Sequence, residues 1–179
     1  MRIRVLTLLA ALTVASSASA QGFNAELHRD LNEVQKKMID LAQAIPESAY
    51  GWKPGSARSV KEVLLHVASD NYFLPIAMGK EAPASTGING TNFAALETYE
   101  KQNLGKDATI AALQASFQHL HQALGATTTD ANLNETIKFF GQDWTRQRAT
   151  LLTITHLHEH LGQLIAYARS NGVTPPWSK

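Results

Sequence analysis

The sequence contains no cysteine, and this absence excludes several features at once. Without cysteine there are no disulfide bonds, no thiolate ligands for a metal ion and no lipid anchor on an N-terminal cysteine. A metal site in this protein would therefore be built from histidine nitrogens and carboxylate oxygens. The sequence has seven histidines, so nitrogen ligands are available.

The sequence also lacks an excess of positive charge. Its 16 Lys and Arg residues face 15 Asp and Glu residues, which gives a formal net charge of +1. A nucleic-acid-binding protein needs clustered positive charge to replace the counterions of the phosphates, so we expect no nucleic-acid partner. No apolar run reaches the roughly 20 residues of a membrane-spanning helix, so we also expect no stable membrane anchor.

The first twenty residues are typical of a secretory signal peptide. Two arginines precede the apolar run VLTLLAALTVA, and a run of small residues ends at Ala20. Cleavage after Ala20 would remove Arg2 and Arg4, which leaves 14 basic against 15 acidic residues. The sequence thus predicts a signal peptide over 1–20, one domain over 21–179, and a periplasmic or secreted location.

Apolar residues recur three and four positions apart along the chain, which predicts amphipathic helices. The first such stripe follows Asn24, its expected N-cap, and it ends at Pro46. The second begins at Ser59 and Glu62, which form the residue pair of a capping box, and it ends at Pro75. We therefore expect two long helices in the first half of the chain.

The second half of the chain predicts a crossover and two more long helices. A polar, glycine-rich connection over 84–92 is followed by a short helix over 93–102. A third long helix is expected from Asp107, its N-cap, to Gly125, its stop, and the last helix is expected over 145–171. Four long amphipathic helices in one domain favour an all-α fold, a four-helix bundle.

Residues 132–144, which precede the last helix, show a local alternation of apolar and polar side chains. Alternation of this kind is typical of a short hairpin. An ordered loop fits the same residues equally well. The sequence leaves both interpretations open.

The stretch HLHEHLGQL in the last predicted helix contains three histidines. At about 100° per residue, His156 and His160 lie about 40° apart on one face, whereas His158 lies on the opposite side and is expected at the surface. Histidines four residues apart project from adjacent turns in the same direction and form a natural chelating pair. Gln163 and Tyr167 share this face; they would orient a ligand or only stabilise the bundle by hydrogen bonds.

A third ligand must come from another helix, and His66 is the candidate. It interrupts the apolar run VLLHVA on the capped second helix, so it is either buried or directed at a ligand. Asp70, one turn further, would be a fourth ligand, a partner of a ligand or a solvated carboxylate, and the sequence alone favours the last. Glu159 flanks His156. Together with His156 and His160 it forms the pattern H-x-x-E-H, which also occurs in one class of zinc proteases. Those enzymes are large, so we interpret this match as accidental.

The segments SVKEVLLHVASDNYF and HLHEHLGQLIAYARSNGVTPPW together resemble the DinB-like (YfiT-like) family of metal-dependent proteins. The resemblance extends over essentially the whole of residues 21–179. It implies a four-helix bundle with a long crossover connection. It also implies three metal ligands, which fall on His66, His156 and His160.

The resemblance further implies a metal-dependent enzyme, because relatives include thiol-dependent transferases and isomerases as well as proteins described as hydrolases. Three imidazoles without a thiolate suit Zn²⁺ best and also accept Ni²⁺, Cu²⁺ or Fe²⁺. Such a site leaves coordination positions open, where an ion lowers the pKa of a bound water to about 7 or holds a thiol as its thiolate. The substrate would be a small molecule of unknown identity. A homodimer is expected from the resemblance alone.

A non-catalytic alternative stays open. The usual thiol cofactors are mainly cytosolic, whereas the first twenty residues predict export. The ion would then be structural or carried, in a periplasmic protein whose function is to bind a metal, a ligand or a partner.

Overall fold

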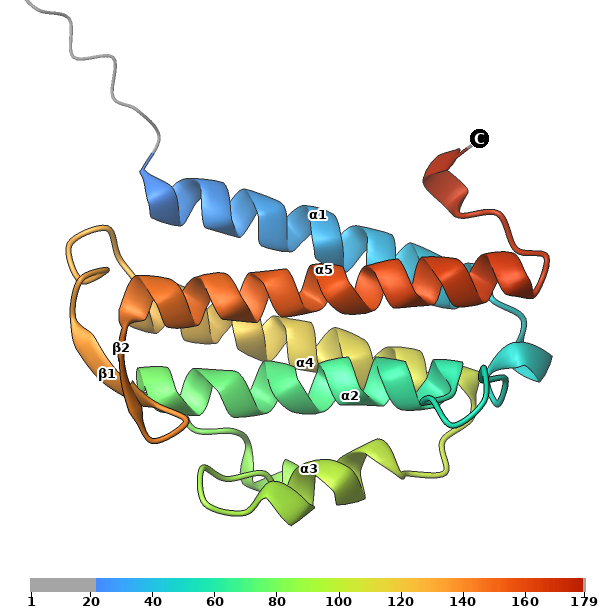
Figure 1. Cartoon of the computed structure of the whole chain (residues 1–179), viewed down its shortest axis with the longest axis horizontal. Coiled ribbons are helices and arrows are strands. Elements are labelled where there is room, and N and C mark those ends of the chain that lie inside the picture. Colours follow the sequence, from blue (N-terminus) through green and yellow to red (C-terminus); the bar gives the residue numbers. More distant parts are fainter. Residues whose placement is uncertain (1–21, 179) are drawn as a thin grey trace, which may run out of the picture.

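Five α-helices and one β-hairpin make up the part of the chain that the structure, a computed structural model, describes, which is residues 22–178 (Figure 1). The signal peptide predicted over 1–20 lies outside these residues. The elements in chain order are α1 (Phe23–Ala44), α2 (Val60–Phe73), α3 (Phe93–Glu100), α4 (Lys106–Thr127), β1 (Thr136–Phe139), β2 (Gln142–Thr145) and α5 (Arg146–Ser170). Short 3-10 turns lie at Glu47–Ala49, Leu74–Met78, Ala84–Thr86 and Pro176–Ser178.

Helices α1, α2, α4 and α5 form a four-helix bundle, as the sequence predicts. Each helix contacts two neighbours, in the order α1, α5, α2, α4 and back to α1. Helices α2 and α4 run in the same direction, so the chain must return along the bundle between them (Figure 1). The segment 74–105, which contains α3, is this long crossover, and α3 packs against α2.

The predicted apolar stripes face the interior of the bundle. In α1 and α4 their side chains are buried, with at most 8% exposed: Leu27, Leu31, Val34, Met38, Leu41, Ile110, Leu113, Phe117, Leu120 and Leu124. Burying one such side chain contributes about 1.5–3 kcal/mol, so these stripes fix the rotation of each helix about its own axis. The directions of the polar side chains on the same helices follow from that rotation.

The starts of α1 and α4 differ from the predicted positions. The N-cap of α1 is Gly22, and the Asn24 backbone N–H donates to Asp130 Oδ1 at 2.9 Å. A carboxylate distant in sequence therefore satisfies the first turn, where the sequence predicted Asn24 as a local cap. The N-cap of α4 is Gly105, and Asp107 lies in the first turn, where a carboxylate favours the helix N-terminus without capping it.

The end of α4 also differs from the prediction, because Gly125 does not stop the helix. The helix continues to Thr127, and the backbone N–H of Thr128 still donates to Leu124 O at 2.9 Å. A glycine ends a helix by adopting a left-handed conformation, which Gly125 does not do. In contrast, the glycine after α5, Gly172, has a φ of 73° and closes that helix as predicted.

The open segment 132–144 contains a hairpin. Strands β1 and β2 pair in antiparallel register with Phe139 opposite Gln142, so Phe140 and Gly141 alone form the turn. Both turn residues have positive φ, 49° and 74°, which is the type I′ pattern of two-residue hairpins. Phe139 is buried in a second small core with Leu74 and Ala149, at the end of the bundle where α2 ends and α5 begins (Figure 1).

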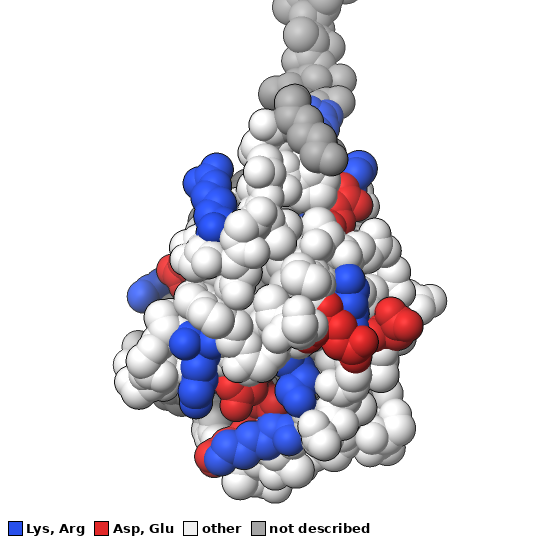
Figure 2. Space-filling model, turned by 90° about the vertical axis from the view of Figure 1, so that its right-hand side faces the viewer, with Lys and Arg blue, Asp and Glu red and all other residues white. Residues whose placement is uncertain are grey.

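The surface of the bundle carries both signs of charge. On the face shown in Figure 2, basic and acidic side chains lie among uncharged ones, and neither sign covers that face. Among residues 22–178, no helix combines the length and the apolar character that crossing a membrane requires.

Candidate metal centre

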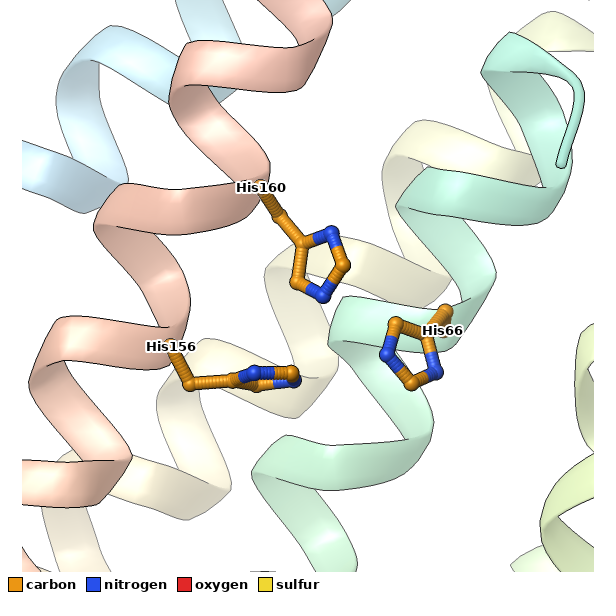
Figure 3. A group of neighbouring side chains, drawn as sticks. All are labelled: His66, His156 and His160. Carbon is orange, nitrogen blue, oxygen red and sulfur yellow. The ribbon is translucent and has the colours of Figure 1, made fainter. Parts of the chain in front are cut away.

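Three histidine side chains from two helices converge between α2 and α5. His66 extends from α2, His156 and His160 extend from α5, and the three rings point toward one another (Figure 3). Their centroids lie 4.4–5.2 Å apart, and each pair of rings is close to perpendicular. One nitrogen from each ring lies within 4.8 Å of the other two. The structure thus brings together the three residues that the family resemblance assigned as ligands.

The core fixes the directions of these side chains. His66 lies between Leu65 and Val67, which are fully buried, and this pins its helix turn against the bundle. On α5, Leu157 and Leu161 are buried directly after His156 and His160, with 1% and 5% exposed. Both histidines therefore lie at the edge of the apolar face and turn toward α2, while the leucines enter the core.

The geometry suits one ion after a small adjustment. A tetrahedral ion bound at about 2.0–2.1 Å to three nitrogens separates them by about 3.4 Å. Because the nitrogens already lie within 4.8 Å of one another, closure requires movements of about 1.4 Å or less. The side chains of His66 and His156 are 14% and 20% exposed, so they are partly shielded from water and still accessible.

His160 is held in the form that binds metals. Its Nδ1 donates to Gln163 Oε1 at 2.9 Å, which leaves Nε2 with a lone pair, and Gln163 Nε2 in turn donates to the Tyr167 hydroxyl at 2.7 Å. Burial, together with the positive charges that His156 and His66 can carry, lowers the pKa of His160 to about 4. His160 is therefore neutral at pH 7. Gln163 and Tyr167 lie on the predicted face and form one hydrogen-bonded chain with His160.

His66 is oriented by a carboxylate that the sequence did not indicate. Its Nδ1 donates to Glu100 Oε1 at 2.7 Å, and Arg58 Nε donates to the other carboxylate oxygen at 2.8 Å. Burial alone would raise the pKa of Glu100, but the hydrogen bonds from His66 and Arg58 outweigh it and hold the pKa below its usual value. Because Nδ1 carries a proton, Nε2 of His66 is left to face the other two rings.

Glu100 escaped prediction because nothing in the sequence links it to His66. It is the last residue of α3, 34 positions away, and it reaches the site only because the crossover folds back onto α2. The nearest signal in the sequence is a carboxylate on the short helix predicted over 93–102. Spacing could not tell it from its exposed neighbour Glu97.

Asp70 is a partner of two histidines, and the sequence-based preference for a solvated carboxylate is wrong. Its Oδ2 lies 2.7 Å from His156 Nε2 and 3.4 Å from His66 Nε2. Its side chain is only 14% exposed. The i, i+4 spacing from His66 places Asp70 on the side of α2 that faces α5, and core packing makes that side semi-buried.

The other polar residues of the HLHEHLGQL stretch lie at the rim or away from the site. Glu159 flanks it as expected, with an oxygen 3.7 Å from His156 Nδ1, but its side chain is 75% exposed, so this contact is weak. His158 lies at the surface as predicted, where its ring pairs with Asp30 of α1 at 3.0 Å. It takes no part in the cluster.

A cavity opens beside the cluster. Its volume is about 160 Å³, and two of its lining residues, Asp70 and His156, belong to the site. The rest of its lining is apolar: Phe73, Leu74, Phe93, Leu96, Phe140 and Leu152. The cluster therefore adjoins a space for a small molecule through His156 and Asp70.

The family model of the DinB superfamily matches residues 30–164, more than half of the chain. The chain belongs to the DinB superfamily. This match confirms the family that the sequence motifs resemble. Among curated proteins, no match to this superfamily member was found.

Solved structures share the fold of this DinB superfamily member. A DinB-like protein from Bacillus cereus is 14% identical, with a TM-score of 0.70 over 87% of this chain and 97% of the other. A DinB-like protein from Bacillus subtilis is 19% identical, with a TM-score of 0.53 over 83% and 94% of the two chains. These likenesses confirm the predicted all-α fold.

A mutant of a mycothiol-dependent maleylpyruvate isomerase is also similar. It is 15% identical, with a TM-score of 0.63 over 79% of this chain and 60% of the isomerase chain. At this identity the likeness shows a common fold.

Proposed function

We propose that this protein is an exported, metal-dependent enzyme that uses its three-histidine site to activate a thiol or a water molecule. One observation carries the proposal, which is that three imidazoles meet beside a cavity lined by His156 and Asp70. A purely structural ion has a closed coordination shell, whereas a catalytic ion keeps a position open to substrate. The cavity supplies that opening.

The donor set supports a divalent transition metal. His66, His156 and His160 offer three nitrogens and no sulfur, a combination that suits Zn²⁺ and also accepts Ni²⁺. The lowered pKa of His160 favours binding, because a protonated imidazole has no lone pair for an ion. Glu100 and Gln163 each hold one ligand ring through its Nδ1, as partners of metal-binding histidines commonly do.

The protein's own residues have distinct roles in this proposal. A divalent ion held by the histidines supplies a positive charge that acidifies a nearby thiol or water molecule. Asp70 borders both the cavity and His156, so its carboxylate is placed to accept the proton that this nucleophile releases. Glu100, Gln163 and Tyr167 keep the rings in position and do not reach the cavity lining.

A thiol is the favoured nucleophile. The similar isomerase is described as mycothiol-dependent, so the fold accommodates a reaction that uses a low-molecular-weight thiol. A transferase that joins such a thiol to an electrophile is the corresponding proposal for this chain. Water in place of the thiol gives a hydrolase at the same site.

The proposed setting follows from the sequence. The signal-peptide pattern over 1–20 supports a periplasmic or secreted enzyme with a small-molecule substrate. The near balance of basic and acidic residues argues against a nucleic-acid partner. A homodimer stays a prediction, which a sizing column tests directly.

The decisive experiment is a turnover assay on the zinc-loaded protein. Low-molecular-weight thiols are paired with an epoxide, an α,β-unsaturated acid and simple esters, and His156→Ala is compared with His158→Ala. We expect turnover in the wild type and in His158→Ala, and its loss in His156→Ala. Absence of turnover in a wild type that binds and is stabilised by zinc would contradict catalysis and favour the non-catalytic binding protein instead.

A further inference from the structure

A second, larger cavity continues the space beside the histidines. Its volume is about 370 Å³, and it lies between the end of α2, the crossover and the hairpin. It shares four lining residues with the smaller cavity, namely Phe73, Leu74, Phe93 and Phe140. The two cavities therefore adjoin each other, and together they extend from the hairpin to Asp70 and His156.

The walls of the two cavities are apolar except for Lys138 on the hairpin and the two polar residues at the histidine end. Of the residues that line the two cavities, only Lys138, Asp70 and His156 carry titratable groups. The Lys138 ammonium already pairs with Asp143 across the hairpin, at 2.6 Å. The larger cavity thus offers four phenylalanine rings and no unpaired charge from its lining, namely Phe73, Phe93, Phe139 and Phe140.

Two of these rings are unusually exposed for their size. Phe93 is 58% exposed and Phe140 is 55% exposed, and both face Phe73, at centroid distances of 5.3 and 6.3 Å. They come from different elements, the start of α3 and the hairpin turn. Exposed apolar side chains that gather around a cavity are typical of a binding site.

The backbone of Phe140 supports the same interpretation. It is the one non-glycine residue with positive φ, 49°, among the described residues, and it occupies a turn position that favours Asn, Asp or Gly. A phenylalanine is strained there, and although its ring contacts Phe139 at 4.6 Å and Phe73 at 6.3 Å, the residue stays 55% exposed. A ligand that covers the ring would bury the apolar surface that folding leaves in solvent.

We propose that the two cavities bind the non-reacting part of the substrate, and that this part is an uncharged aryl or medium-length alkyl group. Its apolar group contacts Phe73, Phe93 and Phe140, and its reacting end lies toward His156 and Asp70. That the ligand is a substrate, with its reacting end at His156 and Asp70, rests on the proposed function; the binding of an apolar group in the cavities does not. The larger cavity, of about 370 Å³, is in the range of small-molecule sites, and the smaller one adds about 160 Å³ beside the histidines.

A fluorescent probe tests the pocket independently of catalysis. N-phenyl-1-naphthylamine is neutral and apolar, and its emission rises when it leaves water. We titrate it into the purified protein and into Phe140→Asn, which removes the ring and restores a favoured Asn-Gly turn, so the variant should fold at least as well. Phe93→Gln is the second variant. Leu151→Gln is the control, because Leu151 is 44% exposed on α5 outside the cavity linings.

We expect the dissociation constant of the probe to rise about tenfold in Phe140→Asn and several-fold in Phe93→Gln, and to stay unchanged in the control. An unchanged constant in both phenylalanine variants would overturn the proposal. The proposal would also be overturned if the wild type were a dimer and Phe140→Asn were a monomer that still binds the probe. The exposed rings would then contact a second copy of the chain and not a ligand.

A series of 4-nitrophenyl esters separates this proposal from the proposed function. For an active enzyme, kcat/KM rises with acyl length from acetate to octanoate in the wild type, and this rise flattens in Phe140→Asn. If no ester or thiol reaction occurs but the probe loses affinity in the variants as expected, the pocket stands and the catalytic proposal fails. If turnover occurs but the probe does not bind, the catalytic proposal stands and the pocket proposal fails.

Discussion

Replacing Glu100 tests whether the histidines act as metal ligands with an oriented ring. The carboxylate accepts from His66 Nδ1 at 2.7 Å while Arg58 holds its other oxygen, so His66 presents Nε2 to the site. Removing such a partner of a metal-binding histidine typically lowers metal affinity by about 10–100-fold, which is about 1.4–2.7 kcal/mol. Glu100→Gln keeps an acceptor oxygen and loses the charge, so we expect the lower end; Glu100→Ala loses both, so we expect the upper end.

The assay is a competition titration of zinc against a chelator of known affinity, at pH 7. Glu97→Gln is the matched control, because Glu97 lies on the same helix and its exposed carboxylate pairs with Lys101. Thermal unfolding of the metal-free proteins checks that each variant is folded. Zinc affinity that is unchanged in Glu100→Ala relative to the control would refute the reasoning, because His66 would then need no orientation or would not be a ligand.

Three further predictions concern stability. Burial and the charge of Lys80 lower the pKa of His119 below its unfolded value of about 6.5, so the unfolded state takes up the proton first. The unfolding free energy should therefore fall as pH drops below about 6.5, and it should fall less steeply in His119→Asn. Phe117→Ala should lower the unfolding free energy in urea by about 3–5 kcal/mol, because the ring is fully buried. Gly141→Ala should lower it by about 1 kcal/mol through its φ of 74° alone, since an added Cβ meets nothing within 4 Å; no change would contradict the turn.

The helices could be predicted because apolar spacing is a local property. The stripe over Leu27–Leu41 and the capping box of Ser59 and Glu62 each depend on residues within a few turns, and both appear in the structure. The helix boundaries were harder, since a distant group can replace a local cap. Asp130 does this for α1, and packing carries α4 past Gly125.

The site was predictable to the extent that it rests on one helix. The pair His156 and His160 follows from their spacing, and the meeting of α2 with α5 was implied only by the family resemblance. Glu100 was out of reach, because its role depends on how the crossover folds back onto α2. Asp70 had the right spacing, but its burial depends on packing against α5.

The hairpin illustrates a different limit. Its alternation was visible, yet Phe140-Gly141 lacks the Asn or Asp that usually marks a two-residue turn, so the sequence could not distinguish a hairpin from a loop. The residue that obscured the prediction is the one whose exposed ring borders the proposed substrate pocket. Local sequence rules are often broken at functional positions.

Metal stoichiometry tests the central claim most directly. Elemental analysis of the purified protein should find about one transition-metal ion per chain, and His66→Ala and His160→Ala should each lose it. His158→Ala should keep it, because His158 lies on the same helix but pairs with Asp30 on the opposite side. Full occupancy in both His66→Ala and His160→Ala, or no metal in the wild type, would contradict a three-histidine metal centre.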